Sequence, residues 1–308
     1  MPGACCPGPI GLAGYTLGED VLDGGGGVTQ PSWHILAVMA VAAAGLAGCG
    51  GDHDSLNDPQ ALIADISTED PIYALTPGLA DGLVIVLHGI QGQDATNENI
   101  RRGLLEGGVD RAVALISWGS RVPFVGAIVN QVNAVGNRVD GQKIADVVVA
   151  YQHRYPGRPV HIVGHSGGAG IAVFAAERLP AGHKVDGLVL LSASIASAYD
   201  LTRALEHTEY GIVNVYNRND GGLLAVGTTV VGTVDGTHGP SGGLMGFDRP
   251  SASDDPDRLR AYRRLFQLDA TQIAGRFGIA HLASTEPDFV SATVTPWLLT
   301  CSWPPARQ

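Results

Sequence analysis

The sequence predicts an α/β fold in which helices cover both faces of a doubly wound, mostly parallel sheet. Two observations lead to this prediction. Short apolar runs rich in Val, Ile and Leu recur along the chain, and stretches with helical spacing of apolar residues separate them. A strand buried on both faces of a parallel sheet shows such a continuous run rather than an alternation. Strands that alternate with helices indicate parallel βαβ units.

Five apolar runs have the length and composition of buried strands, at 82–87, 112–118, 159–163, 187–191 and 212–216. Residues 71–75 are a candidate for one further strand. Helical spacing predicts helices at 97–106, 124–155, 169–178, 198–206 and 287–299. Only one helix fits between the fourth and fifth strands, so a bulky cap domain is not expected there.

Composition excludes several classes of function. The chain has 308 residues, of which 45% are apolar, enough for one large globular domain. Its formal net charge of −11 argues against nucleic-acid binding, which requires a basic surface. No Cys/His cluster has metal-ligand spacing, and we interpret the acidic run at 254–257 as a solvated helix start, not a calcium site. We therefore expect no metal and no cofactor.

The first 48 residues differ from the rest. Residues 1–30 are rich in Gly and Pro and contain no Lys or Arg, and an uncharged apolar run at 35–48 ends at Cys49. This run is shorter than the about 20 apolar residues of a membrane-spanning helix but has the length of a signal-peptide core. The alternative is a buried N-terminal helix of a cytosolic protein.

The segment Leu46-Ala47-Gly48-Cys49 resembles a bacterial lipobox, although no positive charge precedes the apolar run. The resemblance implies an exported lipoprotein of a bacterial cell envelope, anchored to a membrane by a lipid on Cys49. The expected organisation is a leader and signal peptide at 1–48, a tether at 49–70 and one globular domain at 71–308.

The segment Gly164-His165-Ser166-Gly167-Gly168 fits the pattern G-x-S-x-G. In a chain with 43 glycines this pattern can arise by chance as an ordinary strand-to-helix turn. Here it lies directly between a predicted strand and a predicted helix, which is the setting that a nucleophilic serine needs. Side chains at Gly164 and Gly168 would clash where the strand and the helix approach each other.

The order His88-Gly89-Ile90, then the Ser166 turn, then a late Asp and His, resembles the α/β-hydrolases, particularly their lipase and esterase branch, over about 83–299. The resemblance implies an α/β-hydrolase fold with little or no cap. It also implies that the backbone amides of Ile90 and Gly167 bind the oxyanion. We expect His88 to be a structural hydrogen-bonding residue.

A nucleophilic serine needs a histidine base, and that base needs a carboxylate to orient it. In the α/β-hydrolases these groups follow in the order Ser, acid, His. Asp220, directly after the fifth predicted strand, is our candidate acid, and Asp235 and Asp248 are alternatives. An Asp before Gly is also a common turn former. His281, just before the last helix, is our candidate base, and His238 is the alternative.

The sequence therefore predicts a serine hydrolase that cleaves small-molecule or lipid esters through an acyl-enzyme formed on Ser166. A peptidase or thioesterase on the same fold, and a non-catalytic envelope lipoprotein, are the alternatives. The protein is expected to act as a monomer.

Overall fold

The computed structural model describes residues 78–92, 94–120, 125–220, 232–273 and 279–305. The predicted leader, the tether, Cys49 and the candidate strand at 71–75 lie outside these residues. Within the described part of the chain, no helix is long and apolar enough to cross a membrane.

One sheet organises the described residues. Its strands run in the order β2-β1-β3-β4-β5-β6, and each pair of neighbours is parallel. The strands are β1 (Leu83–Leu87), β2 (Ala112–Ile116), β3 (Val160–His165), β4 (Val185–Leu191), β5 (Thr208–Tyr216) and β6 (Leu265–Asp269). The prediction of a parallel α/β sheet is confirmed, and β6 is a strand that the sequence did not predict.

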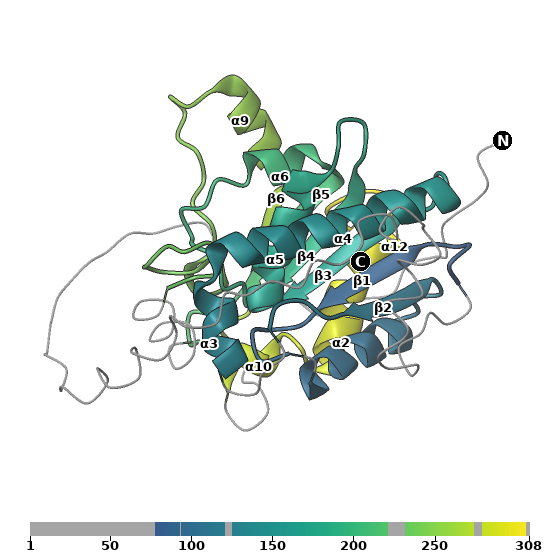
Figure 1. The fold of residues 1–308 in the computed structure, drawn as a ribbon, viewed down its shortest axis with the longest axis horizontal. Coiled ribbons are helices and arrows are strands. Elements are labelled where there is room, and N and C mark those ends of the chain that lie inside the picture. Colours follow the sequence, from purple (N-terminus) through teal and green to yellow (C-terminus); the bar gives the residue numbers. More distant parts are fainter. Residues whose placement is uncertain (1–77, 93, 121–124, 221–231, 274–278, 306–308) are drawn as a thin grey trace, which may run out of the picture.

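Helices cover both faces of this sheet, with α4 and α5 on the face nearer the viewer in Figure 1. The helices up to β5 are α2 (Ala95–Glu106), α3 (Val125–Val132), α4 (Ala134–Arg154), α5 (Gly167–Arg178) and α6 (Thr202–Glu206). Those after β5 are α8 (Gly242–Met245), α9 (Pro256–Tyr262), α10 (Ala280–Ala283), α11 (Pro287–Phe289), the π-helix η5 (Val290–Val294) and α12 (Thr295–Leu299).

Two buried clusters hold these layers together. Along β1, Leu83, Ile85 and Leu87 join the cluster that contains the apolar residues of α4 and α5. The alternate residues Val84 and Val86 join the cluster that contains those of α2, η5 and α12. Because successive side chains of a strand point to opposite faces, a continuous apolar run is what this two-sided burial requires.

The predicted single helix at 124–155 is wrong: Asn133 separates α3 from α4. The Asn133 side chain caps α4, since its Oδ1 accepts a hydrogen bond from the Gly136 amide at 3.0 Å. An asparagine side chain competes with the backbone for such amides and so favours a helix start over a helix interior. The periodicity of apolar residues continues across the break, which is why it does not reveal it.

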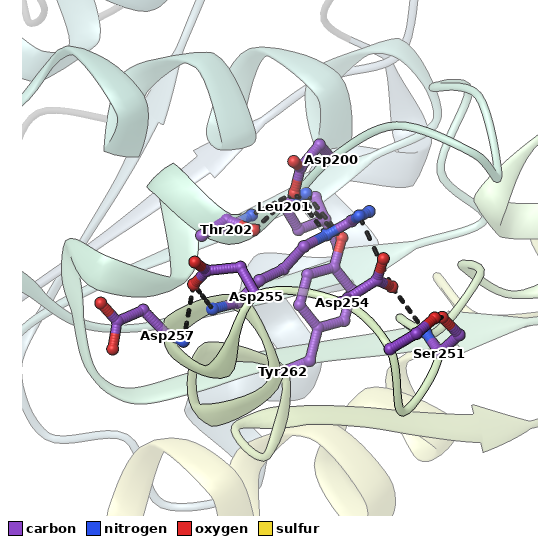
Figure 2. Close-up of polar contacts among 10 residues, drawn as sticks. Asp200, Leu201, Thr202, Ser251, Asp254, Asp255, Asp257 and Tyr262 are labelled. Atoms are coloured by element: carbon purple, nitrogen blue, oxygen red, sulfur yellow. Dashed lines mark hydrogen bonds and ion pairs between the residues drawn. The ribbon is translucent and has the colours of Figure 1, made fainter.

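The acidic run 254–257 begins α9, as interpreted from the sequence (Figure 2). The Asp255 carboxylate accepts hydrogen bonds from the amides of Asp257 and Arg258, at 2.8 and 3.3 Å. Asp254 accepts one from the Ser251 amide at 2.6 Å. These carboxylates therefore cap backbone groups. Among the described residues, no group of three or more His, Cys, Asp or Glu side chains could hold a metal ion.

Candidate active site

Polar residues follow the carboxyl ends of several strands and meet at one edge of the sheet. His88 follows β1, Ser166 follows β3, Ser192 follows β4, and Asp220 lies four residues after β5. The chain leaves β1 for β2 on one side and returns to β3 on the other, so the strand order reverses between β1 and β3. In open parallel sheets, ligands bind in the crevice at such a reversal.

Ser166 sits on a strained turn between β3 and α5. Its backbone has φ 54° and ψ −119°, a conformation that residues with a side chain seldom adopt. The turn is held by main-chain hydrogen bonds: the Ser166 amide donates to the Leu191 carbonyl at 2.9 Å, and the Ser166 carbonyl accepts from the Ser194 amide at 3.0 Å. The strain therefore has a cause in the surrounding structure, as expected of a turn that presents a nucleophile.

The glycines around Ser166 lie where a side chain has no room. A Cβ on Gly164 would come within 2.5 Å of the Gly168 carbonyl oxygen, and one on Gly168 would overlap the carbonyl oxygen of His88. A Cβ on Gly167 would lie 2.6 Å from the Cγ2 atom of Ile90. The loop after β1 and the start of α5 therefore approach each other closely, and the Ile90 side chain lies against the backbone of Gly167.

The Ile90 and Gly167 amides, predicted to bind an oxyanion, donate no hydrogen bond to another described residue. Asn130, on α3, fixes the loop that carries Ile90. Its Nδ2 donates to the Ile90 carbonyl at 3.0 Å, and its Oδ1 accepts from the Ser120 amide at 2.6 Å. Sequence reasoning missed Asn130, because a single asparagine in an apolar helix carries no local signal of this role.

His88 has the structural role expected of it. Its Nε2 accepts a hydrogen bond from the Trp118 amide at 3.1 Å, so Nδ1 carries the proton and donates to the Gly89 carbonyl at 2.7 Å. The Trp118 indole donates in turn to the His88 carbonyl at 2.7 Å. Burial lowers the pKa of His88, so the ring stays neutral. Hydrogen bonds occupy both of its nitrogens, which leaves neither to carry a proton for catalysis.

The candidate acid and base are in contact. His281 Nδ1 lies 2.6 Å from Asp220 Oδ2, and both side chains are buried. The carboxylate can only accept, so Nδ1 carries a proton, and in a neutral imidazole Nε2 is then the nitrogen with the lone pair. Asn217 supports the loop before Asp220 by accepting the Asp220 amide at its carbonyl, at 3.0 Å, and donating its Nδ2 to the Ala270 carbonyl, also at 3.0 Å.

No hydrogen bond joins the Ser166 hydroxyl to His281 within the described residues. Such bonds are often long before substrate binds and tighten in the reacting complex. The histidine predicted as the alternative base, His238, is exposed. The Asp235 carboxylate bonds the Ala196 amide and the Thr237 hydroxyl, at 3.0 and 2.6 Å, and Asp248 is exposed.

His165 contacts the candidate base from the nucleophile turn itself. The His281 carbonyl can only accept, so His165 Nε2 donates to it across 3.3 Å, and the two ring centroids are 4.9 Å apart. Burial, and next the charge that His281 can carry, lower the pKa of His165 to about 3. His165 is therefore a neutral donor that touches the main chain of His281.

Comparison with known proteins identifies the fold. Residues 139–229 match the family described as alpha/beta hydrolase fold. Together with the parallel sheet and its flanking helices, this match assigns the α/β-hydrolase fold to the chain. The match also supports membership of the α/β-hydrolase superfamily. No curated protein matches the sequence.

Several solved structures are similar over part of the chain. A cutinase-like protein from Cryptococcus sp. is 13% identical, with 71% of this chain and 93% of that chain covered and a TM-score of 0.39. An acetylxylan esterase is 9% identical, with coverages of 71% and 96% and a TM-score of 0.39. Aspergillus fumigatus lipase B is 14% identical, with coverages of 87% and 62% and a TM-score of 0.42. None is similar enough to assign an activity.

Proposed function

We propose that this protein, built on the α/β-hydrolase fold, is a serine hydrolase that cleaves carboxylic esters with Ser166, His281 and Asp220. One observation carries the proposal: the buried contact of 2.6 Å between His281 and Asp220 lies at the sheet edge where the strained turn presents Ser166. A carboxylate that fixes the tautomer of a histidine prepares its other nitrogen to act as a base.

In the first half of the reaction, Ser166 Oγ attacks the ester carbonyl carbon while His281 Nε2 takes the hydroxyl proton. Asp220 stabilises the imidazolium that forms. The oxygen of the tetrahedral intermediate becomes negative and binds the amides of Ile90 and Gly167, which have no other described acceptor. The positive end of α5, which begins at Gly167, favours the same charge.

Collapse of the intermediate breaks the bond to the alcohol oxygen, which receives the proton from His281 Nε2. The acyl group remains on Ser166 as an ester. Water then attacks this acyl-enzyme, His281 takes a proton from the water, and the same proton returns to Ser166 Oγ as the carboxylic acid leaves. α6 is the only described helix between β4 and β5, so no cap domain is inserted there. A site without such a cap suits an ester that reaches it directly from solvent.

Turnover of p-nitrophenyl esters of increasing chain length, compared with matched peptide p-nitroanilides, tests this proposal. We expect the full chain to hydrolyse the esters and Ser166→Ala to lose about 10⁴-fold or more in kcat. A fluorophosphonate probe should label the wild type and not Ser166→Ala. Ser253→Ala, on an exposed loop, is the matched control and should behave as the wild type. Equal silence of the wild type and Ser166→Ala would contradict the proposal, and cleavage of the anilides alone would assign a peptidase.

We also propose that the protein is exported and held at a membrane of the cell envelope by a lipid on Cys49. The resemblance of residues 46–49 to a lipobox supports this. In a bacterial host that processes lipoproteins, Cys49→Ala should move the protein from the membrane pellet to the soluble fraction. Cys301→Ala, which removes an exposed cysteine of the folded domain, is the control and should stay in the pellet. An unchanged distribution of Cys49→Ala would contradict the anchor.

A further inference from the structure

We infer that Ser192 is a positioning residue that, through a hydrogen bond to Ser284, holds the short helix α10 and with it His281. This inference rests on the proposed function of His281 as a base. Ser192 and Ser284 have no part in the chemical steps above, and neither stood out in the sequence.

The first support is strain at a residue that is not glycine. Ser192 has φ 48° and, with Ser166, is one of the two described non-glycine residues with positive φ. The main chain holds it there, since the Ser192 amide donates to the Val215 carbonyl at 3.0 Å. Glycine adopts this conformation without strain. A strained serine at such a position therefore points to a use for its side chain.

The second support is what that side chain contacts. Ser192 Oγ lies 3.1 Å from Ser284 Oγ, and the exposed fractions of the two residues are 1% and 2%. Ser284 is the C-terminal cap of α10 and follows His281 by three positions. The contact thus joins the end of β4 to the helix that carries the candidate base.

The third support is that α10 cannot hold itself in place. It has four residues, and Ile279 at its N-cap makes no side-chain capping hydrogen bond. A single helical turn has little stability of its own, so its position depends on tertiary contacts. Besides the contact of His281 Nδ1 with Asp220 after β5, two described hydrogen bonds tie it to the sheet: His165 Nε2 to the His281 carbonyl at 3.3 Å, and Ser192 to Ser284. They start from the ends of β3 and β4, which are neighbours in the sheet.

The candidate nucleophile and the candidate base are therefore both held by hydrogen bonds to the ends of β3 and β4. Ser166 follows β3 and its amide is bonded to Leu191, the last residue of β4, while Ser192 follows directly. A displacement of about 1 Å in such a constellation can cost about 100-fold in rate. Loss of the Ser192–Ser284 hydrogen bond should thus misplace His281 without unfolding the domain.

The decisive variant is Ser192→Gly, because it removes the hydroxyl and relieves the backbone strain together. We expect kcat for the preferred p-nitrophenyl ester to fall about tenfold or more, with KM within about twofold. The melting temperature should equal or exceed that of the wild type. Ser192→Ala and Ser284→Ala should show the same loss of kcat, and the double alanine variant should lose no more than either single variant.

The exposed pair Ser251 and Ser253 is the matched control, since the two hydroxyls are 2.8 Å apart on a loop. Ser251→Ala and Ser253→Ala should leave kcat unchanged. The inference is overturned if Ser192→Gly and Ser284→Ala keep kcat within about twofold. It is equally overturned if the loss of kcat in Ser192→Gly follows a fall in melting temperature, because the role would then be structural.

A second measurement does not depend on turnover. The proton between His281 Nδ1 and Asp220 should give a strongly downfield proton resonance, assigned by its absence in His281→Ala. Ser192→Gly and Ser284→Ala should broaden or shift this resonance, while Ser253→Ala should leave it unchanged. A wild type with no ester turnover would overturn the proposed function alone. An unchanged resonance in Ser192→Gly would overturn the role of Ser192.

Discussion

Two buried histidines at different places in the fold, His281 and His161, show what separates a candidate base from a core residue. His281 lies 2.6 Å from the Asp220 carboxylate at the carboxyl edge of the sheet. His161, the second residue of β3, has neither ring nitrogen hydrogen-bonded, and its ring stacks on Trp303 with centroids 6.4 Å apart. Both rings are buried, so the contact with a carboxylate is what makes His281, and not His161, a candidate base.

The residues around His161 explain why its ring is neutral. Burial, and next the nearby charge of Arg111, lower its pKa to about 3, because neither offers any stabilisation to a charged ring. His161 thus acts as a neutral aromatic side chain in a cluster with Trp303. A buried histidine becomes a candidate base only where a partner accepts one of its protons and the other nitrogen stays free.

The largest expected effect contrasts these two residues directly. His281→Ala should lower kcat for ester hydrolysis by about 10⁴-fold or more, since it removes the proposed acceptor of the Ser166 proton. His161→Phe, which keeps a ring for Trp303 to stack on, should keep kcat within about twofold. Steady-state kinetics of both variants, with melting temperatures, check this. Retained activity in His281→Ala, with loss in His238→Ala, would reassign the base.

A smaller effect is expected from the contact that positions the Ile90 amide. Asn130→Ala removes the hydrogen bond of 3.0 Å to the Ile90 carbonyl and should lower kcat about 10- to 100-fold with little change in KM. Asn99→Ala, on α2, removes a hydrogen bond of 3.2 Å from the Arg102 side chain and serves as the control. Equal kinetics of the two variants would show that Ile90 needs no such support.

The last effect concerns stability and leaves the rate unchanged. His161 in the folded protein binds its proton only near pH 3, whereas in the unfolded chain it does so near its ordinary pKa of 6.5. Between these values the unfolded state binds more protons, so stability falls as pH falls from about 6.5 to about 3. Below about pH 3 both states bind the proton, so stability no longer changes with pH on account of His161, and the loss is complete.

His161→Phe should remove this dependence and leave that of the similarly buried His165. The free energy of unfolding of His161→Phe should therefore decline less steeply with acidification, by up to about 1.4 kcal/mol per pH unit. Urea unfolding between pH 7 and pH 4 measures the slopes. Parallel slopes for the wild type and His161→Phe would mean that His161 does not titrate differently in the folded state.

The strands differ in how far the sequence could predict them. β1 to β5 are buried on both faces along most of their length, so their apolar runs predict them. β6 is an edge strand of which only Leu265 is buried, and its sequence LFQLD contains polar residues. The four-residue helices α8 and α10 also escape prediction, because contacts with the rest of the fold determine them rather than local sequence.

The candidate site shows the same division. Ser166 and Asp220 follow predicted strands, and ends of parallel strands share one edge, so their position at the same edge of the sheet could be anticipated. Chain order placed His281 in the same group, and the structure puts its side chain in contact with Asp220. No sequence pattern predicts the roles inferred for Asn130 and Ser192. One depends on where α3 packs, and the other on a backbone angle set by β5.

The packing of Trp303 has a consequence for the timing of folding. This ring covers Gly187 of β4 so closely that a Cβ there would overlap it, and it also lies against His161 of β3. Its indole donates to the Trp297 carbonyl at 2.6 Å. During synthesis β3 and β4 leave the ribosome long before Trp303 does. β3 and β4 therefore lack the cover that Trp303 provides until residue 303 has been synthesised, so this part of the core is completed later than the strands that it covers.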